Sequence, residues 1–176
     1  MSRTFLHEAG GHGFAKLDDE YGYQDNGKIP EEEIKACKRT KKYGWSKNVD
    51  FTNDPTKVCW NYFLIDTRYA NDGLGVFEGG ITYWTGVWRP TTTSIMESTH
   101  SREFNAPSRE AIYYRIHKLA YGADWQYDYE KFVEWDAKNR KSASAATRGV
   151  PYKSTSFEPT HPPVVINKSW RDEIQK

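Results

Sequence analysis

Hydrophobic and polar positions in the first quarter of the chain predict two helices separated by a polar stretch. Ser2 can cap a helix that carries Leu6 and Phe14, although three glycines weaken it. Residues 18–28 are polar and typical of turns. A second helix is expected over residues 30–42, because proline and three glutamates at its start and lysines at its end suit the helix dipole.

The middle of the chain predicts loops and short strands. From residue 45 to 90, asparagine, aspartate, glycine, proline and aromatic residues predominate. The best strand within this stretch is 81–88. We expect an α+β fold that is mostly helical and rich in loops.

The last third of the chain predicts two more helices and an irregular end. Asn105 or Ser108 can cap the first, which ends before Gly122. Its apolar stripe contains Ile112, Ile116 and Leu119. Asp128 opens the second helix, which continues through Trp135. We therefore expect one domain over residues 1–140 and an irregular extension over 141–176, in which 164–166 can form an edge strand.

Composition excludes several classes of protein. The 25 lysines and arginines nearly balance 24 aspartates and glutamates, for a net charge of +1, which argues against nucleic acid as the main partner. The absence of an apolar run of about 18 residues argues against a membrane span. Aromatic residues make up 15% of the chain, which favours a packed core over disorder. Cys37 and Cys59 can pair or remain thiols.

The segment from His7 to His12 carries the residue types of a zinc hydrolase site. Two imidazoles can bind zinc, and the carboxylate of Glu8 can take a proton from the zinc-bound water. In a regular α-helix, residues five positions apart project about 140° from one another and cannot share an ion. A one-residue π-type bulge brings them together, and Gly10 and Gly11 offer no side-chain obstacle to it. We therefore expect such a bulge.

A two-histidine zinc site needs a third protein ligand. The next acids along the chain are Asp18, Asp19 and Glu20. If the helix ends near residues 14–15, the chain can turn back and present one of them to the metal. The spacing from the second histidine in related zinc enzymes points to Asp18. However, Ala15 stands where such enzymes have a turn glycine, so both aspartates remain candidates.

Three segments, taken in order, resemble the IgA peptidase family of zinc metallopeptidases. The first is His7-Glu8-x-x-Gly11-His12-Gly13-Phe14, followed by Asp19-Glu20-Tyr21. The second is Val87-Trp88-Arg89-Pro90 with Ser94-Ile95-Met96, and the third is Phe104-Asn105-Ala106-Pro107-Ser108-Arg109-Glu110-Ala111. The likeness covers roughly residues 3–140 and is specific because independent motifs occur in the right order.

The resemblance implies a metzincin-like catalytic domain that binds Zn²⁺ and hydrolyses peptide bonds in proteins, with Glu8 as general base. It favours Asp19 over Asp18 as third ligand, and it places Met96 in a methionine turn beneath the metal. Candidate donors to the oxyanion are Tyr21, Tyr83 and His100. The resemblance also implies an exported protein, secreted, periplasmic or at the cell surface.

The start of the sequence lacks two features expected of such an enzyme. Neither a signal peptide nor the sheet that precedes the zinc helix in metzincins comes before His7. We therefore expect the numbering to begin inside a longer protein, of which this chain is a truncated catalytic domain. The alternative is a non-catalytic metallopeptidase remnant that acts as a binding module.

Overall fold

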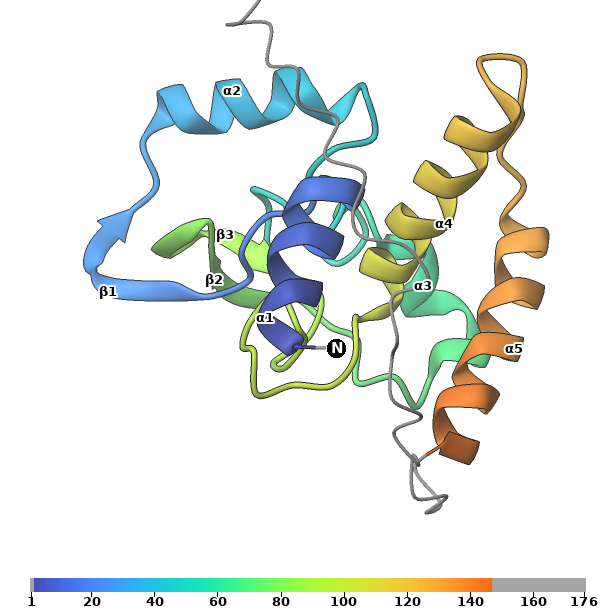
Figure 1. Ribbon diagram of the computed structural model, residues 1–176. Helices are drawn as coiled ribbons and strands as arrows, with labels where there is room; N and C mark the ends of the chain where they lie inside the picture. Colours follow the sequence, from blue (N-terminus) through green and yellow to red (C-terminus); the bar gives the residue numbers. More distant parts are fainter. Residues whose placement is uncertain (1, 147–176) are drawn as a thin grey trace, which may run out of the picture. The chain divides into compact units, whose positions relative to one another are not determined.

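The computed structural model in Figure 1 describes residues 2–146 of the 176-residue chain. The chain divides into two compact units, Met1–Asn139 and Arg140–Lys176. The core and the candidate site lie in the first. The strand expected at 164–166 and most of the expected irregular extension lie outside the described residues. Among residues 2–146, no helix has the length and apolar character needed to cross a bilayer.

Helices and a small sheet together give a mixed α+β structure, as the sequence predicts. The helical segments are α1 (Arg3–Phe5), the π-helix η1 (Leu6–Ala15), α2 (Glu31–Lys41), α3 (Asn61–Ile65), the 3₁₀-helix η2 (Thr67–Tyr69), α4 (Ala106–Tyr121) and α5 (Tyr129–Ala146). The strands are β1 (Gly22–Lys28), β2 (Phe77–Gly80) and β3 (Thr82–Arg89). Because α5 continues to Ala146, the first residues of the predicted extension are helical.

The three strands form one sheet in the order β1-β3-β2. The strand predicted at 81–88 is confirmed within one residue as β3. It pairs parallel to β1, with Gly22 opposite Thr82, and antiparallel to β2. The prediction of turns throughout 18–28 is wrong, because Gly22–Lys28 is an edge strand whose side chains are mostly exposed. A side chain at Gly22 would lie 2.2 Å from the Tyr83 carbonyl oxygen, so glycine allows the two strands to approach.

The predicted caps of the last two helices are confirmed, whereas Ser2 precedes α1 without a side-chain capping hydrogen bond. Helix α4 is capped by Asn105, whose Oδ1 accepts a hydrogen bond from the Ser108 amide at 3.1 Å, and it ends at Gly122. The Asp128 carboxylate accepts a hydrogen bond from an amide in the first turn of α5. The predicted stripe on α4 is not its buried face throughout, because Leu119 is 60% exposed and the buried residues lie between Ala106 and Tyr113.

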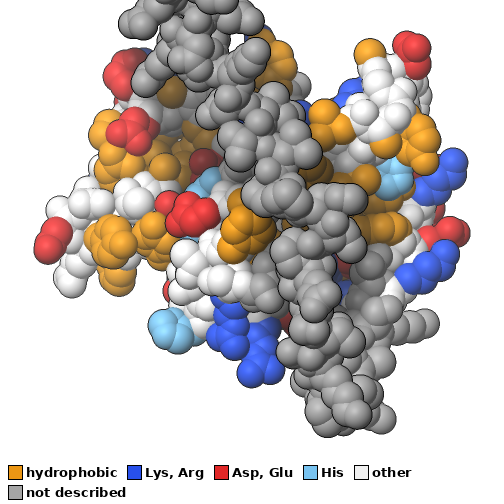
Figure 2. All heavy atoms as spheres, viewed as in Figure 1, with side chains coloured by type: hydrophobic (Ala, Val, Ile, Leu, Met, Phe, Trp, Pro, Cys, Tyr) orange, Lys and Arg blue, Asp and Glu red, His pale blue; other side chains and the backbone are white. Residues whose placement is uncertain are grey.

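Buried side chains form three clusters. The largest is aromatic and joins α3, α4 and α5 around Trp60, Phe63 and Phe132. The second lies between η1 and α4 and contains Met96. The third lies against the sheet; its buried members are Ile29, Val49 and Val87. Figure 2 shows further hydrophobic side chains over α2 and β1 and over α4. The second cluster supports the candidate site directly, since it lies beneath η1.

Candidate metal centre

The helix that carries both histidines is a π-helix over its whole length. Wider turns with i to i+5 hydrogen bonds run from Leu6 to Ala15, and the chain leaves the helix at Lys16 in a left-handed conformation, with φ of 59°. The predicted distortion is therefore confirmed, but its predicted extent of one residue is wrong. Three of the ten residues are glycines, which remove the Cβ atoms that would otherwise crowd neighbouring turns.

Hydrogen bonds to backbone carbonyls fix both imidazole rings. The Nδ1 atom of His7 lies 2.8 Å from the Ile95 carbonyl oxygen, and the Nδ1 atom of His12 lies 2.7 Å from the Leu17 carbonyl oxygen. A carbonyl can only accept, so each Nδ1 carries the proton and donates it. In the neutral ring, the Nε2 atom then keeps a free lone pair. This arrangement is common among metal-binding histidines in proteins.

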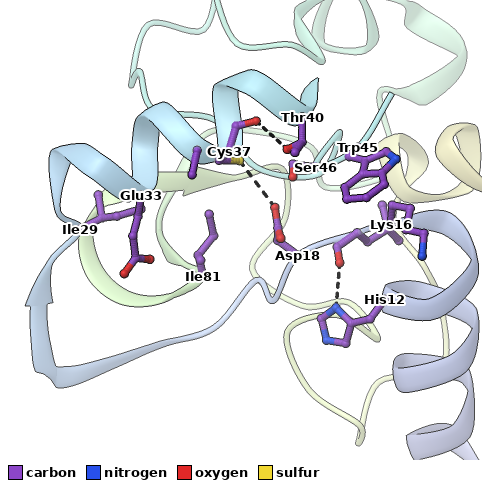
Figure 3. Close-up of a pocket in the computed structure, with 12 residues that line it drawn as sticks. His12, Lys16, Asp18, Ile29, Glu33, Cys37, Thr40, Trp45, Ser46 and Ile81 are labelled. Carbon is purple, nitrogen blue, oxygen red and sulfur yellow. Dashed lines mark hydrogen bonds between the residues drawn. The ribbon is translucent and has the colours of Figure 1, made fainter. Parts of the chain in front are cut away.

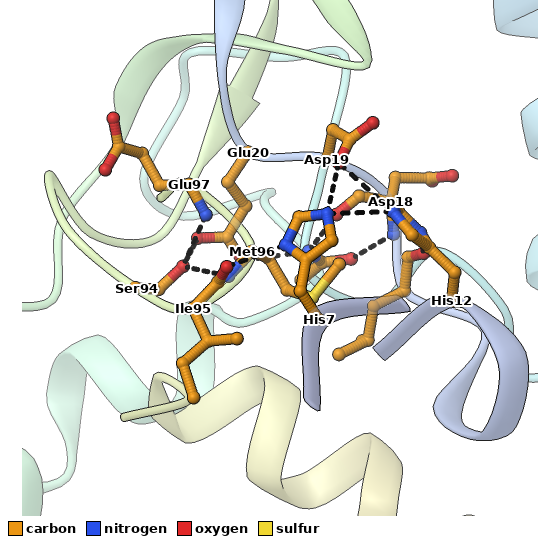
Figure 4. A network of polar contacts seen from close by, with 11 residues as sticks. His7, His12, Asp18, Asp19, Glu20, Ser94, Ile95, Met96 and Glu97 are labelled. Carbon is orange, nitrogen blue, oxygen red and sulfur yellow. Dashed lines mark hydrogen bonds and ion pairs between the residues drawn. The ribbon is translucent and has the colours of Figure 1, made fainter. Parts of the chain in front are cut away.

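The two Nε2 atoms and one carboxylate oxygen converge (Figure 4). His7 Nε2 and His12 Nε2 lie 3.2 Å apart, and each lies 3.1 Å from Asp19 Oδ1. Two donors bound at about 2.0–2.1 Å to a tetrahedral zinc ion lie about 3.3 Å apart. The three atoms thus form a donor set whose chemistry and spacing fit zinc. The His7 side chain is only 6% exposed, whereas that of His12 is 33% exposed, so solvent reaches the cluster on the His12 side.

Asp19, and not Asp18, is brought to the histidines. The Asp18 carboxylate is instead directed towards α2, where Cys37 Sγ lies 3.9 Å from its Oδ2. Asn48 fixes the backbone here by accepting from the Asp18 amide and donating to its carbonyl. The Asp19 carbonyl accepts from the Ile81 amide at 2.8 Å, next to β3. These contacts on both sides hold the segment so that Asp19 faces η1.

The cluster attracts positive charge strongly. A hydrogen bond to the Asp19 carboxylate, only partly offset by burial, raises the pKa of His12 to about 9. Burial alone would raise the pKa of Asp19, but the hydrogen bond from His12 and the charge of the imidazoles leave this pKa below its usual value. Two lone pairs and a carboxylate held this closely repel one another unless a proton or a cation lies among them.

Met96 packs against η1 at Gly11. Its side chain is fully buried, and a Cβ placed on Gly11 would lie 2.3 Å from its Sδ. The turn that contains Met96 is closed by the Ser94 hydroxyl, which accepts from the amides of Met96 and Glu97. Because the Ile95 carbonyl accepts from His7, the same turn orients one of the candidate ligands.

Glu20 has a structural role that the sequence does not predict. Its carboxylate is fully buried and accepts hydrogen bonds from Ser94 Oγ at 2.6 Å, Asn48 Nδ2 at 2.9 Å and Asn105 Nδ2 at 2.8 Å. Burial raises its pKa. The carboxylate therefore joins the segment after η1 to the Met96 turn and to the start of α4. No local sequence pattern indicates this role, because the nearest of these partners, Asn48, lies 28 residues away.

Other predicted site residues divide into those near the cluster and those away from it. Glu8 is exposed on η1, and its charge contributes to the raised pKa of His12. The Tyr21 ring stacks 6.5 Å from that of His7, and burial together with the Asp19 carboxylate raises the pKa of its hydroxyl. Tyr83 instead donates to Glu33 of α2 at 2.6 Å. His100 is exposed and contacts Ser98. The structure thus brings only Tyr21 of the three candidate donors to the cluster.

Both cysteines are free thiols in the structure. Cys37 Sγ lies near Asp18, and Cys59 Sγ lies 3.4 Å from Lys41 Nζ. Burial raises the pKa of both thiols, that of Cys59 to about 11. Of the two alternatives left open by the sequence, the structure therefore contains the unpaired one.

Comparison with protein families and curated proteins adds no relative to this picture. No protein-family model matches the chain, and no curated protein matches it. The geometry of the cluster and the residues around it therefore indicate what the chain can do.

Proposed function

We propose that this chain is a zinc-dependent endopeptidase domain of metzincin-like organisation. The observation that carries the proposal is the convergence of His7 Nε2, His12 Nε2 and Asp19 Oδ1 within 3.2 Å of one another. Glu8, which follows His7 in the chain, is exposed. Three protein ligands are the number that catalytic zinc sites use, which leaves a position for water or substrate.

Each residue of the proposed site has a separate role in peptide hydrolysis. His7, His12 and Asp19 would hold the ion. Zinc bound there would supply Lewis-acid chemistry, lowering the pKa of water and polarising a carbonyl oxygen. The Glu8 carboxylate accepts a proton from the attacking water and passes it to the leaving amine. The Tyr21 hydroxyl donates to the oxygen on which negative charge develops.

Two features of the surroundings support the metzincin-like organisation. Met96 forms an apolar floor in contact with the backbone of Gly11, between the two histidines. The same turn accepts the hydrogen bond from His7 and is tied through Glu20 to the segment of Asp19. We propose protein or peptide substrates and an exported location, both from the family resemblance.

Peptide hydrolysis by the wild-type chain and by the Glu8→Gln variant tests the proposal. The zinc-loaded chain should cleave a mixed fluorogenic peptide library, and a chelator should abolish cleavage. Glu8→Gln should lower kcat by about 10²–10⁴-fold with unchanged zinc content, because only the proton transfer is lost. Glu134→Gln, an exposed substitution on α5, is the control and should leave kcat unchanged.

Two results would contradict the proposal. The first is full activity in Glu8→Gln, which would remove the assigned base. The second is stoichiometric zinc without hydrolysis of any peptide in the library, which would identify the chain as the non-catalytic binding module.

A further inference from the structure

A cavity of about 590 Å³ lies between the end of η1, the loop after α2, and α4. Its lining is strongly basic and includes no aspartate or glutamate. The basic side chains are those of Lys16, Lys42, Arg115 and Lys118. The whole chain has a net charge of only +1, so this groove concentrates positive charge that the overall composition conceals. We call it the basic groove.

The charges of the basic groove are not balanced by acids. Among the residues that the structure describes, none of its four bases forms an ion pair. Lys118 Nζ donates to two backbone carbonyls, whereas the buried Nε of Arg115 has no hydrogen-bond partner within residues 2–146. Buried polar atoms without a partner are rare in proteins and often mark the place of a missing one.

Aromatic rings form the mouth of the basic groove. Lys16 Nζ lies 5.5 Å from the centroid of the Trp45 ring, and Lys42 Nζ lies 4.9 Å from that of Tyr43. Between the two rings, Gly44 adopts a φ of +81° and packs against Tyr114. The tight turn at Gly44 thus presents two rings and two ammonium groups on one surface.

The basic groove continues towards the candidate metal centre. A neighbouring pocket of about 460 Å³ is lined by His12 and by Asp18 (Figure 3). Lys16 and Trp45 line both this pocket and the basic groove. A ligand that spans the distance from His12 through the pocket to the groove must be extended, as a polypeptide is.

We infer that the basic groove binds an acidic segment of the protein substrate, several residues away from the bond that is cleaved. Arginine pairs with carboxylates through two parallel hydrogen bonds, and Lys42 supplies a second charge at the mouth. The inference rests on the proposed function, because that function makes the ligand a polypeptide. It adds a substrate class, namely proteins with aspartate or glutamate near the cleavage site.

Peptide binding to the zinc-loaded Glu8→Gln chain tests the inference without requiring cleavage. The probe is a fluorescein-labelled dodecapeptide of alternating Glu and Ala, measured by anisotropy at low salt, and the reference is the same peptide with Gln for each Glu. The Glu peptide should bind more tightly. Lys42→Gln/Arg115→Gln should weaken its binding by about fivefold or more, because each exposed ion pair contributes up to about fivefold. The control Arg102→Gln/Lys131→Gln removes the same charges from exposed positions outside the groove.

The outcomes separate the inference from the proposed function. Selective loss in the groove variant, with shifts of the Gly44 amide resonance on peptide addition, supports the inference even if the wild-type chain cleaves no peptide. Equal affinity for the Glu and Gln peptides, or equal loss in both double variants, overturns it. Binding of a sulfated hexasaccharide without binding of the Glu peptide also overturns it and identifies a glycan site.

Discussion

Substitution of Gly11 by alanine tests the contact between the π-helix and the methionine turn. The new Cβ would lie 2.3 Å from Sδ and 2.9 Å from Cε of Met96, which is fully buried. Forcing extra atoms into a packed core costs about 1–3 kcal/mol. The flexibility of methionine favours the lower part of this range. Alanine stabilises a helix by up to about 1 kcal/mol relative to glycine, and this stabilisation partly offsets the cost of the clash.

Gly10→Ala is the matched control, because its Cβ would meet only Phe104 Cζ at an ordinary 3.9 Å. Both variants gain the same helix propensity, so their difference isolates the contact with Met96. Urea unfolding of the metal-free chains should show Gly11→Ala to be about 1–2 kcal/mol less stable than Gly10→Ala. In a Met96→Val background, which lacks both clashing atoms, the difference should disappear. Equal stability of the two variants, or a difference that persists with valine, refutes the contact.

Four further predictions concern the candidate metal centre. Asp19→Asn should lower zinc affinity at least tenfold by isothermal titration, whereas Asp18→Asn should leave it unchanged; the reverse result would assign Asp18 as ligand. Because the pKa of His12 is raised to about 9, its contribution to the stability of the metal-free chain is complete below about pH 6.5 and is lost as the pH rises through 9. Over the same range zinc affinity should rise by up to about tenfold per pH unit, because zinc displaces one proton, and a pH-independent affinity would contradict this. Tyr21→Phe should lower kcat by about 10²–10³-fold with zinc content unchanged, and loss of zinc instead would make Tyr21 a residue that orients Asp19.

Local chemistry let the sequence predict the parts of the site that lie close together in the chain. The five-residue spacing of His7 and His12, with glycines between them, required a widened turn, and η1 supplies it. The predicted widening of a single turn was too short. The spacing of the two histidines shows that one turn must widen, but it does not show how many turns do. The cap of α4 is likewise local, because the Asn105 side chain accepts a hydrogen bond from an amide only three residues later.

Long-range contacts explain what the sequence did not predict. The edge strand β1 has no hydrophobic alternation and is defined by pairing with β3, some 60 residues later. The choice of Asp19 over Asp18 depends on Asn48 and Ile81, which fix the backbone from two sides. The part played by Glu20 depends on partners 28 to 88 residues away. Such contacts leave no local pattern.

X-ray absorption at the zinc edge tests the central claim most directly. The zinc-loaded chain should give one ion per chain, with two imidazole nitrogens and carboxylate oxygen at about 2.0–2.1 Å, and the imidazole signal should fall by half in His12→Ala. An ion surrounded by water oxygens alone, or a spectrum unchanged by loss of His12, would contradict a metal centre built on the π-helix.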